Sequence, residues 1–217
     1  MSTVALPPTA AAADVLQLLG RPGHLFPPLR WFAPPPGPLL GAARTVRLMV
    51  SDEGPGLAPL REVLCEDLDG RVLLVAGGAA VPGACWGEIL SVAARGRGAV
   101  AALIEAGVRD LEALGATGLP VAGSHQVLAG PGGRLHAVEV GGRITLGEAT
   151  VSDGDRILID ADGAVTLGGP RDHDAVLEHA AAYAAAEEAV LAALTAGDVL
   201  DAAYRHKAEV VGWIVDG

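Results

Sequence analysis

The sequence predicts an α/β fold in which a mixed sheet packs between layers and C-terminal helices follow it. Two apolar runs, at 70–76 and 100–104, have the continuous hydrophobicity of parallel strands that are buried on both faces. Short strand-like segments separated by glycine turns fill 135–167, a pattern typical of antiparallel pairing. Parallel βαβ units followed by short antiparallel strands favour an α/β/α sandwich with a mixed sheet.

The beginning of the chain, 1–41, predicts one helix and a long irregular connection. The helix is expected at 9–19, with Thr9 as its N-cap. Residues 21–41 are rich in proline, and this composition predicts an extended, irregular segment. Its large apolar side chains indicate that the segment packs down instead of linking two domains. They are Leu25, Phe26, Trp31 and Phe32.

The remaining elements alternate between strands and helices. Strands are expected at 44–50, 70–76, 100–104, 120–122, 135–140, 143–146, 156–159 and 164–167. Helices are expected at 57–64, 86–94, 111–114, 172–196 and 199–210. We expect a single domain over 1–217, with 172–212 as a C-terminal helical segment. The long helix at 172–196 has no partner nearby in the sequence, which leaves packing across a subunit boundary open.

Composition and charge restrict the partners of the chain. It has 217 residues, of which 51% are hydrophobic and 3% aromatic, and its formal net charge is −11. A phosphate backbone would be repelled and no basic stripe is present, so we expect no nucleic-acid partner. The longest weakly charged run, at 72–87, is broken by glycine and proline, so we expect no membrane span.

The cysteines and the start of the chain favour a cytoplasmic location. Cys65 and Cys85 have no CxxC spacing and are expected to be reduced thiols, with Cys85 a small buried hydrophobe. Residues 1–20 lack the basic region that begins a secretory signal.

Two neighbouring segments predict a site at the sheet edge. The glycine-rich loop 77–83 precedes a helix that starts near Trp86, and the N–H groups of a helix start can bind an anion. Arg109 and Asp110 follow the apolar strand at 100–104, where ligands of open α/β sheets bind. An arginine there can bind a carboxylate with two hydrogen bonds, and an aspartate can hold a hard divalent cation. A surface ion pair, with Asp110 as a helix N-cap, is the alternative.

The same stretch resembles the RraA-like family. The segments that carry the resemblance are WGEIL at 86–90, ARGRG at 94–98 and IEAGVRD at 104–110, with further similarity at 35–46 and 141–167. This family includes 4-hydroxy-4-methyl-2-oxoglutarate aldolases, oxaloacetate decarboxylases and the regulator of ribonuclease activity A. The resemblance covers most of residues 10 to 200 and implies a swivelling-type β/β/α sandwich.

The resemblance also implies the roles of individual residues. Asp110 would ligate Mg²⁺ or Mn²⁺, Glu88 would reach the metal through a water, and Arg109 would bind the substrate carboxylate. Main-chain donors in the segment 86–90 would bind the carboxylate and keto group of a pyruvate-like substrate. The segment consists of Trp86, Gly87, Glu88, Ile89 and Leu90. From the residues alone, Glu88 could equally be a first-turn glutamate that the helix dipole stabilises. Glu105 stands where the family commonly has Asp and is expected to have a supporting role.

Two positions depart from the family pattern. Aldolase members often carry an acid three positions after the metal-binding aspartate, but Ala113 stands there, and Glu112 would face a different way on a helix. Ser124 and His125 stand where a basic residue is common, so a cation near the distal end of the substrate is missing. His125 could replace this cation when protonated, or it could have no role.

Three further groups of residues have side chains that could take part in a site. Asp160 and Asp162 are expected to form a turn rather than a metal site. Glu187 and Glu188 are expected to be solvated, or to approach the metal of a neighbouring subunit as the resemblance suggests. Lys207 is the only lysine and lies near the C-terminus, which argues against a Schiff-base mechanism.

The sequence therefore predicts a divalent-metal-dependent lyase, an aldolase or decarboxylase that acts on a pyruvate-type 2-keto acid through a metal-stabilised enolate. The resemblance implies a homotrimer or hexamer. Two alternatives stay open: a non-catalytic, RraA-like regulatory binding protein, and a specialised enzyme that keeps the metal site but has a changed substrate pocket.

Overall fold

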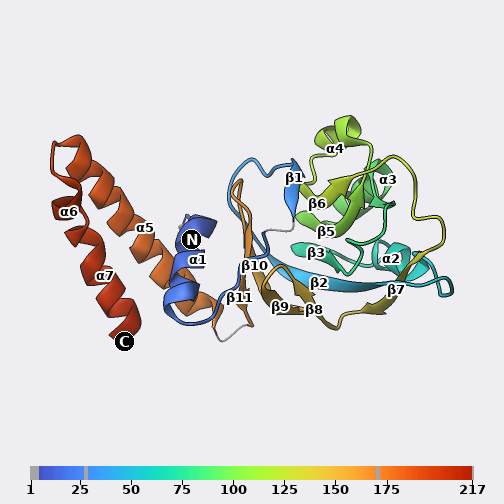
Figure 1. Ribbon diagram of the computed structural model, residues 1–217, viewed down its shortest axis with the longest axis horizontal. Coiled ribbons are helices and arrows are strands. Elements are labelled where there is room, and N and C mark those ends of the chain that lie inside the picture. Colours follow the sequence, from blue (N-terminus) through green and yellow to red (C-terminus); the bar gives the residue numbers. More distant parts are fainter. Residues whose placement is uncertain (1–4, 27–28, 170–171, 217) are drawn as a thin grey trace.

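Parallel strands form the centre of a mixed sheet (Figure 1). The computed structural model describes residues 5–26, 29–169 and 172–216. The parallel strands lie in the spatial order β6, β5, β3, β2. They are β2 (Leu39–Val50), β3 (Arg71–Ala76), β5 (Ala101–Val108) and β6 (Val121–Gln126). The apolar run in β3 is buried on both faces, as its sequence predicts.

Antiparallel strands extend the sheet on both sides, which confirms the predicted mixed sheet. The long strand β2 pairs β10 at its start and β7 at its end, and β1 lies beside β6 at the opposite edge. β4 pairs the end of β5 in parallel, and β8 and β9 form a separate antiparallel hairpin. These strands are β1 (Arg30–Ala33), β4 (Ala84–Trp86), β7 (Leu135–Val140), β8 (Arg143–Leu146), β9 (Ala149–Ser152), β10 (Arg156–Ile159) and β11 (Ala164–Gly168).

The side chains of β3 point alternately into two cores, and this alternation shows the layers. Leu73 and Val75 pack with the helices α2 (Ala58–Val63), α3 (Glu88–Gly96) and α4 (Leu111–Thr117). Val72 and Leu74 pack on the opposite face with buried residues of the β8–β9 hairpin. One face of the sheet is therefore covered by helices and the other by strands. This is the β/β/α arrangement that the family resemblance implies.

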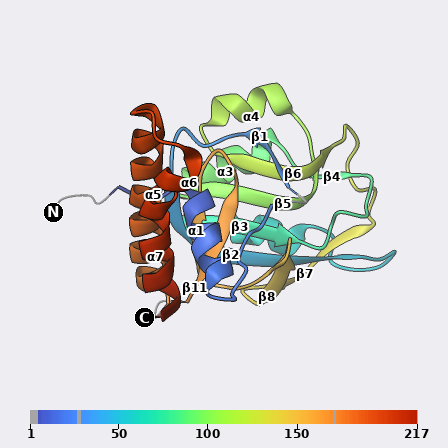
Figure 2. The same ribbon diagram turned by 60° about the vertical axis from the view of Figure 1, so that its left-hand side comes forward.

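A third core joins the two ends of the chain. The helices α1 (Thr9–Leu18), α5 (His173–Thr195) and α7 (Arg205–Asp216) pack together with apolar residues of β10 and β11. Figure 1 shows these helices beside the sheet, and Figure 2 shows α5 and α7 side by side with α1 next to them. The long helix α5 thus has its packing partners within its own chain.

Some expected elements differ from those in the structure. The proline-rich segment contains β1 and the start of β2, both ordered by pairing with distant strands, and residues 27 and 28 lie outside the described part. The helix expected from residue 86 begins at Glu88, because Trp86 still pairs with β5. The helix expected at 199–210 is divided into α6 (Leu200–Ala203) and α7. None of the described helices has the length and apolarity needed to cross a bilayer.

Candidate active site

The predicted site lies where β4 and β5 end and α3 and α4 begin. The main-chain N–H of Arg109 donates to the carbonyl of Trp86 at 3.1 Å and ties the two strand ends together. A pocket of about 240 Å³ opens there. Its walls come from the start of α3, the Arg109–Asp110 pair, two residues of α2 and its entry, and the loop at Gly130 and Pro131.

Asp110 has an unusual backbone conformation. Its φ of 61° is the only positive value at a non-glycine position in the described part of the chain. Asp110 stands at the N-cap position of α4, but its side chain makes no capping hydrogen bond. Instead, Oδ2 accepts a hydrogen bond from the N–H of Glu88 at 3.3 Å and lies 3.7 Å from Nε of Arg109. Asp110 therefore forms the ion pair and takes the N-cap position of that alternative, but its side chain does not cap its own helix. Backbone strain of this kind clusters at functional sites.

Gly87 leaves room for this carboxylate. A Cβ at position 87 would lie 2.5 Å from Oδ2 of Asp110 and 3.1 Å from Cγ of Arg109. The φ of Gly87 is −175°, which any residue can adopt, so space and not backbone conformation requires the glycine. Gly87 of the WGEIL segment thus allows the start of α3 to lie close to Asp110.

The first turn of α3 presents main-chain donors to the pocket. A helix start leaves its first N–H groups without intrahelical partners, and the N-cap residue of α3, Gly87, has no side chain to satisfy them. The N–H of Glu88 is bonded to Asp110, whereas Ile89 and Leu90 line the pocket. This helix start suits an anionic group of a ligand.

Trp86 has a structural role. Its side chain is 1% exposed, and its indole N–H donates to Oγ of Ser91 at 2.8 Å. The Ser91 hydroxyl donates in turn to the carbonyl of Gly87 at 3.0 Å. Trp86 lines the pocket from a fixed position, and its ring has no polar group left to offer a ligand.

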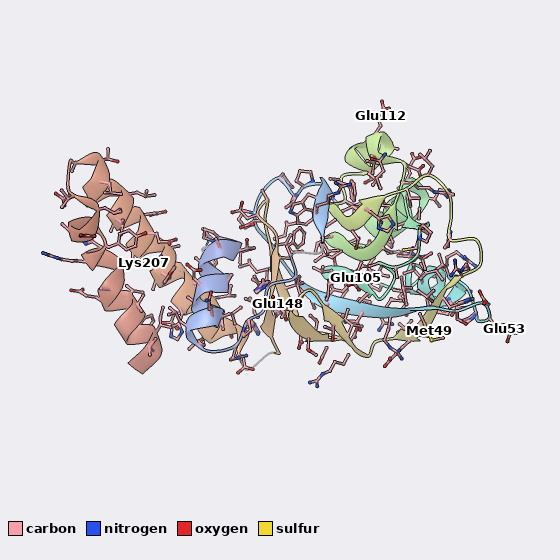
Figure 3. All side chains as sticks on the ribbon, viewed as in Figure 1. Met49, Glu53, Glu105, Glu112, Glu148 and Lys207 are labelled. Carbon is pink, nitrogen blue, oxygen red and sulfur yellow. The ribbon has the colours of Figure 1, made fainter. Side chains whose placement is uncertain are left out.

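Carboxylates gather in a hollow beside the pocket. Glu88, Asp110 and Glu112 line a depression of about 570 Å³, together with Ala113. Glu112 and Ala113 thus border the same hollow although they are successive residues of α4. Figure 3 shows the Glu112 side chain pointing away from α4. Within residues 5–26, 29–169 and 172–216, no group of three or more His, Cys, Asp or Glu residues could hold a metal ion.

The predicted donors nevertheless fit one type of cation. Mg²⁺ usually keeps several waters and binds through one or two carboxylates. Asp110 and Glu88 supply hard oxygen donors, and both side chains are exposed to water. Oδ1 of Asp110 has no protein hydrogen-bond partner in the part of the chain that the structure describes.

Other candidates lie outside the pocket. Oε2 of Glu105 accepts a hydrogen bond from the N–H of Gly77 at 2.6 Å, so this side chain fixes the glycine loop. Ser124 and His125 do not line the pocket. Oε1 of Glu187 lies 2.7 Å from Nζ of Lys207, within the chain's own C-terminal helices.

The acids at 160–163 form the expected turn. Asp160 accepts main-chain hydrogen bonds from Asp162 and Gly163, which closes the turn. It also accepts from the N–H and the hydroxyl of Thr9, at 2.7 and 2.6 Å. The N-cap of α1 is Pro8, so Thr9 is not the N-cap that the sequence predicts; the side chain of Asp160 satisfies its N–H instead.

Two further side chains line the pocket, and only Arg61 was not anticipated from the sequence. Cys85 is the buried residue that the sequence predicts, and burial raises the pKa of its thiol to about 12, so it stays neutral. Arg61 reaches the pocket from α2 together with Leu57. The spacing of four residues, which places two side chains on one helix face, was the available signal.

A family comparison matches the chain over most of its length. The model of the RraA-like family, described as Aldolase/RraA, matches residues 9–166, and the chain belongs to this family. The family includes both lyases and regulatory proteins. A search of the curated proteins finds no match to this chain.

Solved structures share the fold at low sequence identity. An uncharacterized protein from Pseudomonas syringae pv. tomato is 21% identical with a TM-score of 0.77, over 91% of this chain and 92% of that one. Streptomyces coelicolor RraAS2, described as an unusual member of the RNase ES inhibitor RraA family, is 22% identical with a TM-score of 0.73, over 82% and 88%. The RNA-processing inhibitor RraA of Thermus thermophilis is 25% identical with a TM-score of 0.60, over 73% and 93%.

Proposed function

We propose that this protein is a divalent-metal-dependent lyase that cleaves or decarboxylates a pyruvate-type 2-keto acid. The observation that carries the proposal is the position of the Asp110 carboxylate. It turns away from its own helix, at the cost of a left-handed backbone, and lies beside Arg109 and the start of α3. A residue with only a structural role would gain more as a helix cap, which is worth about 1 kcal/mol.

Asp110 would hold Mg²⁺ or Mn²⁺ directly, with Glu88 bonded through a water. When bound, the cation would supply Lewis acidity to the 2-keto oxygen of the substrate. Cleavage of an aldol and loss of CO₂ from a β-keto acid both place negative charge on this oxygen, so one site would serve both reactions.

The protein groups have separate tasks in this proposal. Arg109, whose side chain is 47% exposed, has donors available to bind the substrate carboxylate with two hydrogen bonds. The N–H groups of Ile89 and Leu90 would bind the remaining negative charge at the helix start. The exposed Glu88 carboxylate would hold a water that delivers a proton to C3 of the product. In aldol cleavage this proton balances the one that the substrate hydroxyl loses, and in decarboxylation it comes from solvent.

A lysine-dependent route does not suit this arrangement. Figure 3 shows Lys207 in the C-terminal helices, far from the end of the molecule where Glu112 lies. Its amine is engaged with Glu187 at 2.7 Å, and a Schiff-base reaction needs an unprotonated amine at the site.

Substrate cleavage with and without metal tests the proposal. We expect pyruvate release from oxaloacetate or 4-hydroxy-4-methyl-2-oxoglutarate with Mg²⁺ or Mn²⁺, and none with EDTA. Asp110→Asn removes the charge but keeps a residue that tolerates a left-handed backbone, so the fold should persist while activity falls at least about a hundredfold. Asp162→Asn, at an exposed turn, is the matched control. A folded wild type that releases no pyruvate from either substrate would disprove the proposed activity.

A second candidate is a non-catalytic binding protein. Exposed apolar side chains beside the pocket favour a protein contact there: Ile89 is 77% exposed, Val92 57% and Leu128 84%. The same surface would serve a homotrimer or hexamer, which light scattering of the purified chain would reveal. If the activity assay is negative and the site binds no Mn²⁺, this candidate replaces the lyase.

A further inference from the structure

We propose that Arg61 binds a second anionic group at the distal end of the substrate and so selects 2-keto acids that carry two carboxylates. This inference rests on the proposed function, because it assigns Arg109 and the start of α3 to the keto-acid end. It adds a specificity-determining residue from α2, an element that contributes none of the residues named for the reaction.

The position of Arg61 supports this role. Arg61 and Leu57 lie one helical turn apart and both line the pocket that contains Arg109 and Asp110. The helix is held in place by Leu60 and Val63, which are buried in the core beneath it. Its exposed face is therefore fixed relative to the pocket.

The guanidinium of Arg61 has no acidic partner in the part of the chain that the structure describes. Two arginines of the neighbouring strand β2 are paired, by contrast: Arg44 makes two hydrogen bonds to Glu66, and Arg47 donates to Glu139 at 2.7 Å. An unpaired arginine at the wall of a pocket retains its full set of donors for a ligand.

The charge of the pocket points to a dianionic ligand. Asp110 is the only acid in its wall, against the two cations Arg61 and Arg109. The remaining wall is mainly apolar, and Cys85 contributes a neutral thiol. In a chain with a net charge of −11, two arginines at one pocket form a local positive focus for an anion.

Pocket size limits the ligand to a short chain. The volume of about 240 Å³ is below the range of roughly 300–1,000 Å³ that is typical of drug-sized ligands. A 2-keto acid of four to six carbons with a second carboxylate combines this size with the charge. The basic residue missing at Ser124 and His125 is thus replaced from α2, because His125 does not line the pocket.

Calorimetric binding of two matched ligands tests the inference. The probes are 2-oxoglutarate and 2-oxopentanoate, which share their chain length and keto-acid end and differ in the distal carboxylate. With Mn²⁺ present, wild type should bind 2-oxoglutarate at least about tenfold more tightly, the effect of one charge-assisted contact. Arg61→Ala should remove this preference and leave the affinity for 2-oxopentanoate unchanged. Arg61→Lys should keep part of the preference.

Two controls separate the inference from the proposed function. Arg95→Ala removes an exposed positive charge from α3 outside the pocket and should keep the preference. Arg109→Ala should weaken both ligands. If wild type binds both ligands equally, or if Arg61→Ala weakens both equally, the role of Arg61 is overturned while the keto-acid site stands. If neither ligand binds to the metal-loaded wild type, the proposed function falls and the role of Arg61 falls with it.

Discussion

Asp110 combines a strained backbone with an exposed charge. A left-handed conformation costs a residue with a Cβ about 1–2 kcal/mol, and Asp110 recovers none of this through a cap. Its carboxylate keeps one hydrogen bond, to the N–H of Glu88, and its position depends on the empty space at Gly87. The position of the Asp110 carboxylate therefore depends on the absence of a Cβ at Gly87.

Gly87→Ala tests this dependence. The new methyl group would meet the end of a side chain, so the Asp110 carboxylate moves and the fold remains. We expect the affinity for Mn²⁺, followed by electron paramagnetic resonance, to fall at least about tenfold, a loss of roughly 1.4 kcal/mol. The stability to urea should change by less than about 1 kcal/mol.

Gly96→Ala is the control for the same helix. A Cβ at position 96 meets no atom within 4 Å, so this variant should bind Mn²⁺ as wild type does. It should also gain about 0.5–1 kcal/mol of stability, because alanine is the better helix former. Equal Mn²⁺ affinity in both variants would contradict the role assigned to Gly87.

At the scale of elements, the start of α1 is bonded to a single distant side chain. Asp160, in the turn between β10 and β11, is 9% exposed and accepts two hydrogen bonds from Thr9 at the start of α1. It accepts two more from its own turn, at Asp162 and Gly163. One carboxylate thus satisfies donors in its own turn and at Thr9, which lies 151 residues from Asp160 in the sequence.

Asp160→Ala should destabilise the protein strongly. The substitution leaves buried donors unsatisfied at both the helix and the turn, so we expect a loss of about 3 kcal/mol in the free energy of unfolding. Urea denaturation followed by circular dichroism would measure it. Asp162→Ala, in the same turn but exposed, should stay within about 0.5 kcal/mol of wild type. A loss of the same size in both variants would show that the turn, and not the link to α1, is responsible.

The elements also show what sequence patterns can predict. β3 and the start of β5 were predicted because strands buried on both faces are continuously apolar. β1 and the first residues of β2 were not predicted, because the proline-rich composition around them is typical of irregular structure. Their partners β6 and β10 also lie far along the chain. The three residues of β4 are too few to show any period.

The candidate site was predictable in part for a similar reason. Glu88, Arg109 and Asp110 belong to short motifs, so the sequence indicated them together. The spacing of Leu57 and Arg61 places them on one helix face, but only the packing of α2 on the sheet brings that face to the pocket. The sequence does not reveal the left-handed conformation of Asp110 either, because an aspartate that caps its own helix would stand at the same position.

At the scale of the whole molecule, Lys207 of α7 connects α1, near the start of the chain, with the C-terminal helix α5. It bonds Glu187 at 2.7 Å, lies 3.9 Å from Asp14 of α1, and stands 4.2 Å from the centre of the Tyr183 ring. The Tyr183 hydroxyl completes the group by donating to Asp14 at 2.8 Å. Burial lowers the pKa of Lys207, but the bonds to Glu187 and Tyr183 outweigh burial and raise it above its ordinary value of 10.5.

Lys207→Met should loosen the C-terminal helices and leave the sheet intact. We expect a loss of about 1–2 kcal/mol from the ion pair and the cation–π contact. Hydrogen exchange should become faster in α7 and stay unchanged in β3 and β5. Because the pKa of Lys207 is raised on folding, its contribution is fully present below pH 10.5 and is lost as the pH rises through the folded value. A difference between wild type and variant that disappears already at neutral pH would contradict this assignment.

The contact between Gly87 and Asp110 also bears on how relatives of this chain can diverge. While the carboxylate at 110 is kept, a side chain at 87 has no room, so the two positions are not free to vary independently. Once the acid is lost, the tight contact that remains is with Cγ of Arg109 at 3.1 Å, so position 87 can accept alanine or serine after a small shift of that side chain. Among related sequences, the residue aligned with Gly87 should therefore separate members that retain the lyase chemistry from those that have become binding proteins.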